Sequence, residues 1–200
     1  MMALDWKIRK MDKILSGNNL SYKGRVELFY VRGGKQYKAI ACNAGMQGIS
    51  ELFTRACLGY TLTNYRPFAV NMISADESWE PGSSVLGEPQ KLRASTYDVI
   101  KETDIESEDD AYLIGWKFPI FDALITTENM INVGSGNHYL QLLSLNGSEL
   151  ARVKIKIDVD SLDGSSQQED TVPTLPLREG NNILVKWYMY LSNRTEEDNA

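Results

Sequence analysis

The chain has few of the residues on which metal sites and many catalytic sites depend. Its 200 residues include one histidine, His138, and two cysteines, Cys42 and Cys57. These three side chains cannot supply the four ligands of a structural zinc site, and two cysteines are too few for a disulfide scaffold. We therefore expect free thiols, folding in a reducing compartment, no metal and no cofactor.

Long apolar runs and an excess of positive charge are also missing. Charges are spread through the N-terminal segment and no later run is long enough to cross a bilayer, so we expect neither a signal peptide nor a membrane span. A net charge of -6 provides no global attraction to nucleic acid or anionic lipid. The 42% of hydrophobic residues are enough for a globular core, which excludes a fibrous or wholly disordered chain.

Most of the chain has the pattern of β-strands. Gly33-Gly34 and Asn146-Gly147 each separate two β-rich runs, as in a hairpin turn. The full glycine, lysine and Ser/Thr spacing of a phosphate loop is absent at Gly33-Gly34. Further strands are expected over residues 66–73, 91–99, 111–121, 138–145, 149–158 and 182–191. Because the last strand has large side chains on both faces, we expect it to be central or to face another subunit.

Two segments have helical spacing. Apolar residues recur at three- and four-residue steps over residues 44–58, which predicts the main α-helix, with Cys57 as an inert core thiol. A second apolar stripe runs through the first 20 residues, at Leu4, Ile8, Met11 and Leu15. Such a helix can pack on its own domain or lie as an arm on a neighbouring subunit, and the sequence leaves both open.

These elements predict a mainly β protein, with an antiparallel β-sandwich or jelly-roll-like domain over residues 21–192. A helix or arm over residues 1–20 precedes it, and a flexible acidic tail over residues 193–200 follows. The expected core includes Leu52, Phe53, Val70, Trp116, Val153, Ile155, Val185 and Trp187. Residues 75–89 and 161–176 are expected to be long loops, which are usually functional or disordered.

Several residue groups could carry chemistry, but each has a simpler structural explanation. His138 begins a predicted strand with no nucleophile motif nearby, so a structural role is favoured over a catalytic triad. The spacing of Asp158, Asp160, Asp163 and Glu169 departs from that of a calcium loop. A solvated loop explains the acidic cluster Asp104, Glu106, Glu108, Asp109 and Asp110 better than a glycosidase carboxylate pair. We therefore predict no catalytic, cofactor-binding or metal residues.

Aromatic side chains offer one further possibility. A sugar- or base-binding platform could be built from Trp79, Trp116, Trp187, Tyr188 and Tyr190. Large residues at strand spacing more often form a core or an interface, and the acidic balance argues against nucleic acid.

The order of features over roughly residues 39–192 resembles that of tailed-bacteriophage virion proteins of the tail, neck and fibre-attachment type. The matching elements are Asn43-Ala44-Gly45 before the helix, the strand PFAVNMI, Leu86-Gly87-Glu88 with Arg93, Ile131-Asn132-Val133-Gly134, Leu150-Ala151-Arg152 and the strand ILVKWYMYLS. This resemblance implies a non-enzymatic structural subunit of a virion, made in the host cytoplasm.

The resemblance also implies partners. These would be copies of the chain itself, in a ring or trimer, and other virion proteins of the neck, tail or fibres, without nucleic acid or membrane. The alternative from a different functional class is a carbohydrate-binding β-sandwich that recognises a host surface through exposed aromatic side chains.

Overall fold

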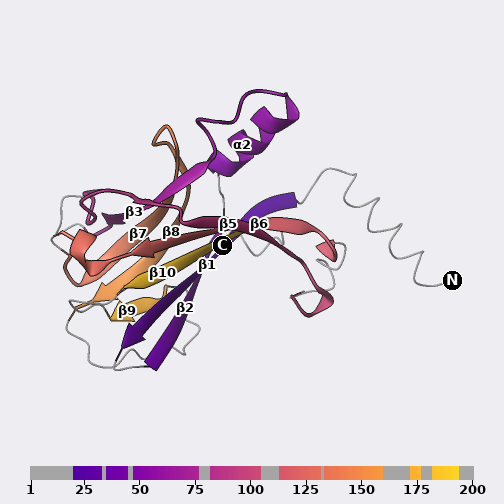
Figure 1. Cartoon of the computed structure of the whole chain (residues 1–200). Coiled ribbons are helices and arrows are strands. Elements are labelled where there is room, and N and C mark those ends of the chain that lie inside the picture. The colour runs from indigo at the N-terminus through magenta and orange to yellow at the C-terminus, as the bar shows by residue number, and fades with distance from the viewer. Residues whose placement is uncertain are drawn as a thin grey trace.

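The chain folds into two five-stranded β-sheets with one α-helix in its described part, so the expected mainly β, sandwich-like fold is confirmed (Figure 1). The computed structural model describes residues 20–32, 35–44, 47–76, 82–104, 113–131, 133–159, 172–176 and 182–193. The expected N-terminal arm and acidic tail lie outside these ranges, apart from Leu20 and Asn193.

Sheet A is antiparallel throughout. Its order is β2 (Lys35–Ala44), β1 (Leu20–Arg32), β10 (Ile183–Asn193), β6 (Lys117–Ile125) and β5 (Ala94–Val99). Strands β1 and β2 form the hairpin expected around Gly33-Gly34. The last strand, β10, lies between β1 and β6, which confirms its expected central position.

Sheet B is mixed. Its order is β4 (Gln90–Lys91), β3 (Pro67–Ser74), β7 (Gly136–Ser144), β8 (Glu149–Asp158) and β9 (Thr174–Pro176). Only β9, which runs parallel to β8, departs from antiparallel pairing. The hairpin expected around Asn146-Gly147 joins β7 to β8, and Gly147 has a φ of 84°, a conformation that favours glycine.

The core lies between the two sheets and consists of side chains at alternate strand positions. On β8 the buried residues Val153, Ile155 and Ile157 alternate with the exposed Arg152, Lys154 and Lys156. On β10 the buried side chains are those of Ile183, Val185, Trp187 and Met189. Of the expected core, Val70, Val153, Ile155, Val185 and Trp187 are at most 3% exposed.

The expected main helix is confirmed as α2 (Gln47–Cys57), but most of its apolar stripe is not in the core. Ile49 is buried and Leu52 is partly buried, whereas Phe53 is 53% exposed and Cys57 is also exposed. The expectations for Phe53 and Cys57 are therefore wrong. The physical reason is that α2 packs on β8 near its N-terminal end, where Gly48 lies close to the β8 backbone, so only one end of the stripe is covered.

Two expected strands begin or end elsewhere. The strand expected over residues 91–99 is divided, because the chain leaves sheet B after β4 and enters sheet A at β5. The strand expected from residue 111 begins at Lys117, after a turn in which Gly115 has a φ of 85°. Trp116 lies in this turn and is 45% exposed, so its expected place in the core is also wrong.

The two segments expected to be long loops contain ordered core residues. Val85 and Leu86 are each 1% exposed, and isolated bridges join Ser84 to Ile73 and Leu86 to Met130. Within the second segment, Leu175 of β9 is buried. Outside these two segments, the chain also forms two short 3-10 helices, Glu102–Asp104 and Thr127–Asn129. In the two segments expected to be long loops, residues 77–81 and 161–171 lie outside the described ranges.

Candidate interaction surface

The outward side of sheet A, which we call the outer face, carries apolar side chains that no described element covers. The charged side chains on the same side include those of Arg25, Glu27, Lys38, Asp122 and Lys186. The register aligns Phe29 of β1 with Leu184 of β10, and Leu184 with Leu124 of β6. Val31 is 56% exposed and Ile40 is 43% exposed on the same side. The one described α-helix packs on β8 of the other sheet. The outer face therefore leaves apolar side chains in contact with solvent, which is typical of an interaction surface.

Aromatic side chains extend the outer face toward one end. The ring of Phe118 on β6 lies 6.2 Å from that of Tyr188 and 6.0 Å from that of Tyr190, the second pair in an edge-to-face arrangement. Aromatic pairs prefer such offset and edge-to-face arrangements. The end of the face near Tyr190 is thus an aromatic surface.

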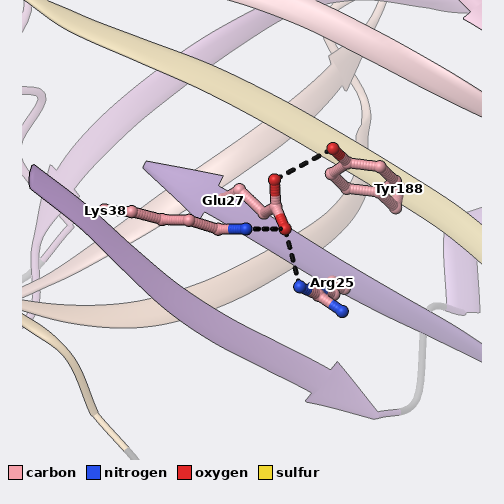
Figure 2. A network of polar contacts seen from close by, with 4 residues as sticks. All are labelled: Arg25, Glu27, Lys38 and Tyr188. Atoms are coloured by element: carbon pink, nitrogen blue, oxygen red, sulfur yellow. Dashed lines mark hydrogen bonds and ion pairs between the residues drawn. The ribbon is translucent and has the colours of Figure 1, made fainter. Parts of the chain in front are cut away.

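A buried carboxylate lies in the middle of this face. Although Glu27 is on the outward side of β1, it is only 6% exposed. Arg25 Nη2 lies 2.6 Å from its Oε1, Lys38 Nζ lies 2.5 Å from the same oxygen, and the Tyr188 hydroxyl donates to Oε2 at 2.9 Å. Figure 2 shows these groups converging on Glu27 from three neighbouring strands. Both carboxylate oxygens are therefore bonded within the sheet.

This network changes the acidity of two of its members. Burial alone would raise the pKa of the Glu27 carboxyl, but the hydrogen bonds from Lys38 and Tyr188 and the charges of Lys38 and Arg25 lower it below its usual value. Burial, the hydrogen bond to Glu27 and its negative charge raise the pKa of Tyr188 to about 12. Glu27 is therefore ionised and Tyr188 is neutral at physiological pH.

Two cations also cover the apolar part of the face. Lys38 Nζ lies 5.5 Å from the centre of the Phe29 ring, and Lys186 Nζ lies 6.0 Å from it on the other side of β1. Cation–π contacts of this length contribute on the order of 0.5–1 kcal/mol at exposed sites. The Phe29 ring is therefore flanked by a lysine on each neighbouring strand, next to the buried Glu27 carboxylate.

A second apolar surface lies on the β5–β6 hairpin. Figure 1 shows these two strands extending past the stacked sheets. Tyr97 is 63% exposed, and Ile114 and Trp116, between the strands, are each 45% exposed. Lys117 Nζ lies 4.8 Å from the Tyr97 ring centre. The hairpin therefore presents aromatic side chains away from the core.

The aromatic residues considered as a platform do not form one surface. Trp187 is fully buried between the sheets, Tyr188 and Tyr190 lie on the outer face, and Trp116 lies on the hairpin. Trp79 lies outside the described residues. A platform of the five residues is therefore excluded, because Trp187 is inaccessible.

The surroundings of His138 include two residues that the sequence pattern did not indicate. Ser74 is its direct neighbour across β3 and β7, and the carboxylate of Asp76 accepts a hydrogen bond from the Asn137 N–H at 2.8 Å. His138 Nδ1, however, lies 3.1 Å from the Gly136 carbonyl oxygen, where a triad would place a carboxylate. Ser74 and His138 are 1% and 2% exposed, so a substrate cannot reach them. These residues do not form a triad.

The two acidic groups lie mostly outside the described residues. Asp158 ends β8 and Asp104 ends a 3-10 helix, but Asp160, Asp163, Glu169, Glu106, Glu108, Asp109 and Asp110 are not described. Within the described ranges, no three His, Cys, Asp or Glu side chains are grouped to hold a metal ion. The same ranges contain no helix with the length and apolar character of a membrane span.

Comparison with known proteins adds no assignment to these surfaces. No protein-family model matches the chain, and neither curated proteins nor solved structures give a match. What bears on function is therefore the outer face, the hairpin and the order of the sequence features.

Proposed function

We propose that the chain is a non-enzymatic structural subunit of a tailed-bacteriophage virion, located at the neck, tail or a fibre attachment point. It is made in the host cytoplasm and acts through contacts with copies of itself, in a ring or trimer, and with other virion proteins. The resemblance in the order of sequence features supports this role, and the sandwich-like frame is compatible with it.

The observation that carries the proposal is the exposed apolar outer face. A monomeric soluble protein rarely leaves a large contiguous apolar patch in water, and such patches mark association sites. Here the exposed Val31 lies two residues from the partly covered Phe29 on β1, and Leu184 lies opposite Phe29. The exposed Ile40 lies on the same face, opposite Glu27. Glu27 is already bonded to Arg25, Lys38 and Tyr188, so a docking protein need not supply a partner for its carboxylate. Arg25 Nε and Asp122 Oδ1 on the same face are buried without a hydrogen-bond partner among the described residues, so a docking protein could bond to them.

The test places charge on this face. In the double variant Val31→Asp with Ile40→Asp, the chain should still fold, because both side chains are exposed, but its incorporation into phage particles should be lost. The control, Thr63→Asp with Asn64→Asp, adds the same charge at exposed positions between α2 and β3 and should be incorporated normally. Antibodies against the chain measure its amount in purified particles. Particles without the wild-type chain, or normal incorporation of the Val31 and Ile40 variant, would contradict the proposal.

The exposed aromatic side chains of the hairpin favour one alternative, a carbohydrate-binding module for host-surface recognition. Tyr97 and Trp116 lie on the same hairpin and both contact solvent, as rings that stack on sugars do. This function predicts a monomer by light scattering that binds an array of bacterial surface glycans, with binding lost in Trp116→Ala. A closed oligomer without glycan binding would favour the virion role instead.

A further inference from the structure

Strand β5 leaves sheet A with an open edge. In the described part of the chain it pairs only with β6, and every side chain from Ala94 to Asp98 is exposed. The strand is therefore in contact with solvent on both faces as well as along its outer side. A strand of this kind is a template for the addition of another strand.

The other three sheet edges are less suited to strand addition. Strand β4 has two residues, and β9 has three and includes Pro176. Strand β2 has ten, but it packs against β8 and carries Lys35 and Lys38, and lysine on an edge disfavours pairing. Between Ala94 and Val99 there is no lysine or proline, and the only charge is that of Asp98.

The β5–β6 ladder fixes which backbone groups point outward. The Ile100 N–H donates to the Trp116 carbonyl at 2.9 Å and the Ile100 carbonyl accepts from the Gly115 N–H at 2.8 Å, so both backbone groups of Ile100 point toward the segment that leads into β6. Hydrogen-bonded pairs alternate along an antiparallel ladder, so the N–H and C=O groups of Ser95, Tyr97 and Val99 point away from β6. Tyr97 lies opposite Pro119, which has no N–H to donate, and this agrees with the assignment.

We infer that β5 pairs with β5 of a second copy, antiparallel and across a two-fold axis at Tyr97. Of the ways to add a strand here, this one needs no other partner and joins the two sheets A into one continuous sheet. The axis places Tyr97 opposite its own copy, Ser95 opposite Val99 and Thr96 opposite Asp98. The residues whose N–H and C=O groups point away from β6 therefore lie opposite one another and can hydrogen-bond. No like charges lie opposite each other within Ala94–Val99.

The exposed side chains support the same partner. Tyr97 is the most exposed large side chain on the strand, and pairing brings the two Tyr97 rings together on one side of the joined sheet. The outward N–H and C=O groups of Ser95 and Tyr97 gain backbone partners, and the Val99 N–H exchanges its 2.8 Å hydrogen bond to Asp98 Oδ1 for a backbone carbonyl. If the chain also forms a ring, this contact joins two rings back to back.

The first test removes one outward N–H. Proline at an edge position whose N–H points to solvent leaves the β5–β6 ladder intact, so Ser95→Pro should fold and halve the mass measured by light scattering. Ser95→Ala, which keeps the N–H, should retain the wild-type mass. A wild-type chain that is monomeric, or a folded Ser95→Pro variant with unchanged mass, would overturn the inference.

The second test does not depend on the proline variant folding. In a background with Cys42→Ser and Cys57→Ser, Tyr97→Cys should form a disulfide-linked dimer on oxidation, because directly opposite Cα atoms lie about 5.5 Å apart. Thr96→Cys is the matched control, since it lies opposite Asp98 and its own copy is too distant for a disulfide. Equal cross-linking of the two variants, or none in Tyr97→Cys, would exclude pairing centred on Tyr97.

This inference does not rest on the virion role. Charge on the outer face tests incorporation into particles, whereas Ser95→Pro tests the mass of the purified chain. Either result can fail while the other holds, so the two proposals are separable.

Discussion

Two adjacent residues of β10 show how differently the faces of sheet A are used. Trp187 is fully buried between the sheets, whereas Tyr188 lies on the outer face, partly exposed, with its hydroxyl bonded to Glu27. The inner face is buried and apolar, as close packing of a core requires. The outer face is also rich in apolar residues but has a bonded charge at its centre. A central strand can therefore stabilise the fold with one face and leave the other accessible, as the proposed association requires.

The largest effect expected from this difference is at Trp187. Trp187→Ala should lower the free energy of unfolding by about 3–5 kcal/mol, because it leaves a cavity between the sheets. The matched change on the other face, Tyr188→Phe, removes only the hydroxyl and should cost about 1 kcal/mol. Urea unfolding at pH 7 measures both. Similar losses in the two variants would show that the faces are not energetically distinct.

The next-largest loss of stability is expected for Glu27, the buried carboxylate of the outer face. Glu27→Gln should lower stability by about 2 kcal/mol at pH 7, since it removes a carboxylate that accepts three charge-assisted or hydroxyl hydrogen bonds. Because folding lowers the pKa of Glu27, its contribution is fully present above the unfolded value near 4.5 and is lost as the pH falls below it. The difference between wild type and variant should therefore shrink at acidic pH.

A surface ion pair provides the control for Glu27. Glu51 and Arg55 form an i,i+4 pair on α2 with Nη2 and Oε1 2.7 Å apart, but the Glu51 side chain is 57% exposed. Glu51→Gln should cost only about 0.3–0.5 kcal/mol. A loss in Glu27→Gln no larger than this would mean that burial of the carboxylate adds nothing to its pairing.

The core side of sheet B also has a titratable group, His138 of β7. Burial lowers its pKa below the ordinary value near 6.5, although the Gly136 carbonyl and Asp76 oppose the shift. The unfolded chain therefore binds a proton at a pH where the folded chain does not, and stability is present above pH 6.5 and falls below it. The slope is at most about 1.4 kcal/mol per pH unit.

The measurement for His138 needs no variant, because the chain has one histidine. Its ring protons in an NMR titration report a single pKa in the folded chain, and the same chain in urea gives the unfolded value. A folded-state pKa at or above the value in urea would contradict the predicted loss of stability at acidic pH.

Sequence pattern predicts the strands well because alternation and turn residues are local. The alternation in β8, the two hairpins expected around Gly33-Gly34 and Asn146-Gly147, and the two-faced pattern of β10 all match the structure. Pattern does not show where a segment changes sheets, as between Lys91 and Ala94, because that depends on long-range pairing.

The candidate surfaces are harder to predict from sequence than the fold. Glu27 alternates with buried residues and is indistinguishable from a solvated side chain until β2 and β10 bring Lys38 and Tyr188 to it. Ser74 and His138 are 64 positions apart and meet only through the pairing of β3 with β7. An apolar stripe likewise shows that a face prefers burial, but not whether the domain is large enough to cover it.

A small effect is expected for Phe53 on α2, where that last point can be tested directly. Phe53 and Ile49 are four residues apart on one helical face, yet Phe53 is 53% exposed and Ile49 is 4% exposed. Ile49→Ser should cost about 2–4 kcal/mol, as a polar group replaces a buried side chain against β8, whereas Phe53→Ser should change stability by about 0.5 kcal/mol or less. Urea unfolding of the dilute chain compares the two. A loss above about 1 kcal/mol in Phe53→Ser would mean that the outer part of the α2 stripe is covered in solution, and a loss that appears only at high protein concentration would place that cover on another subunit.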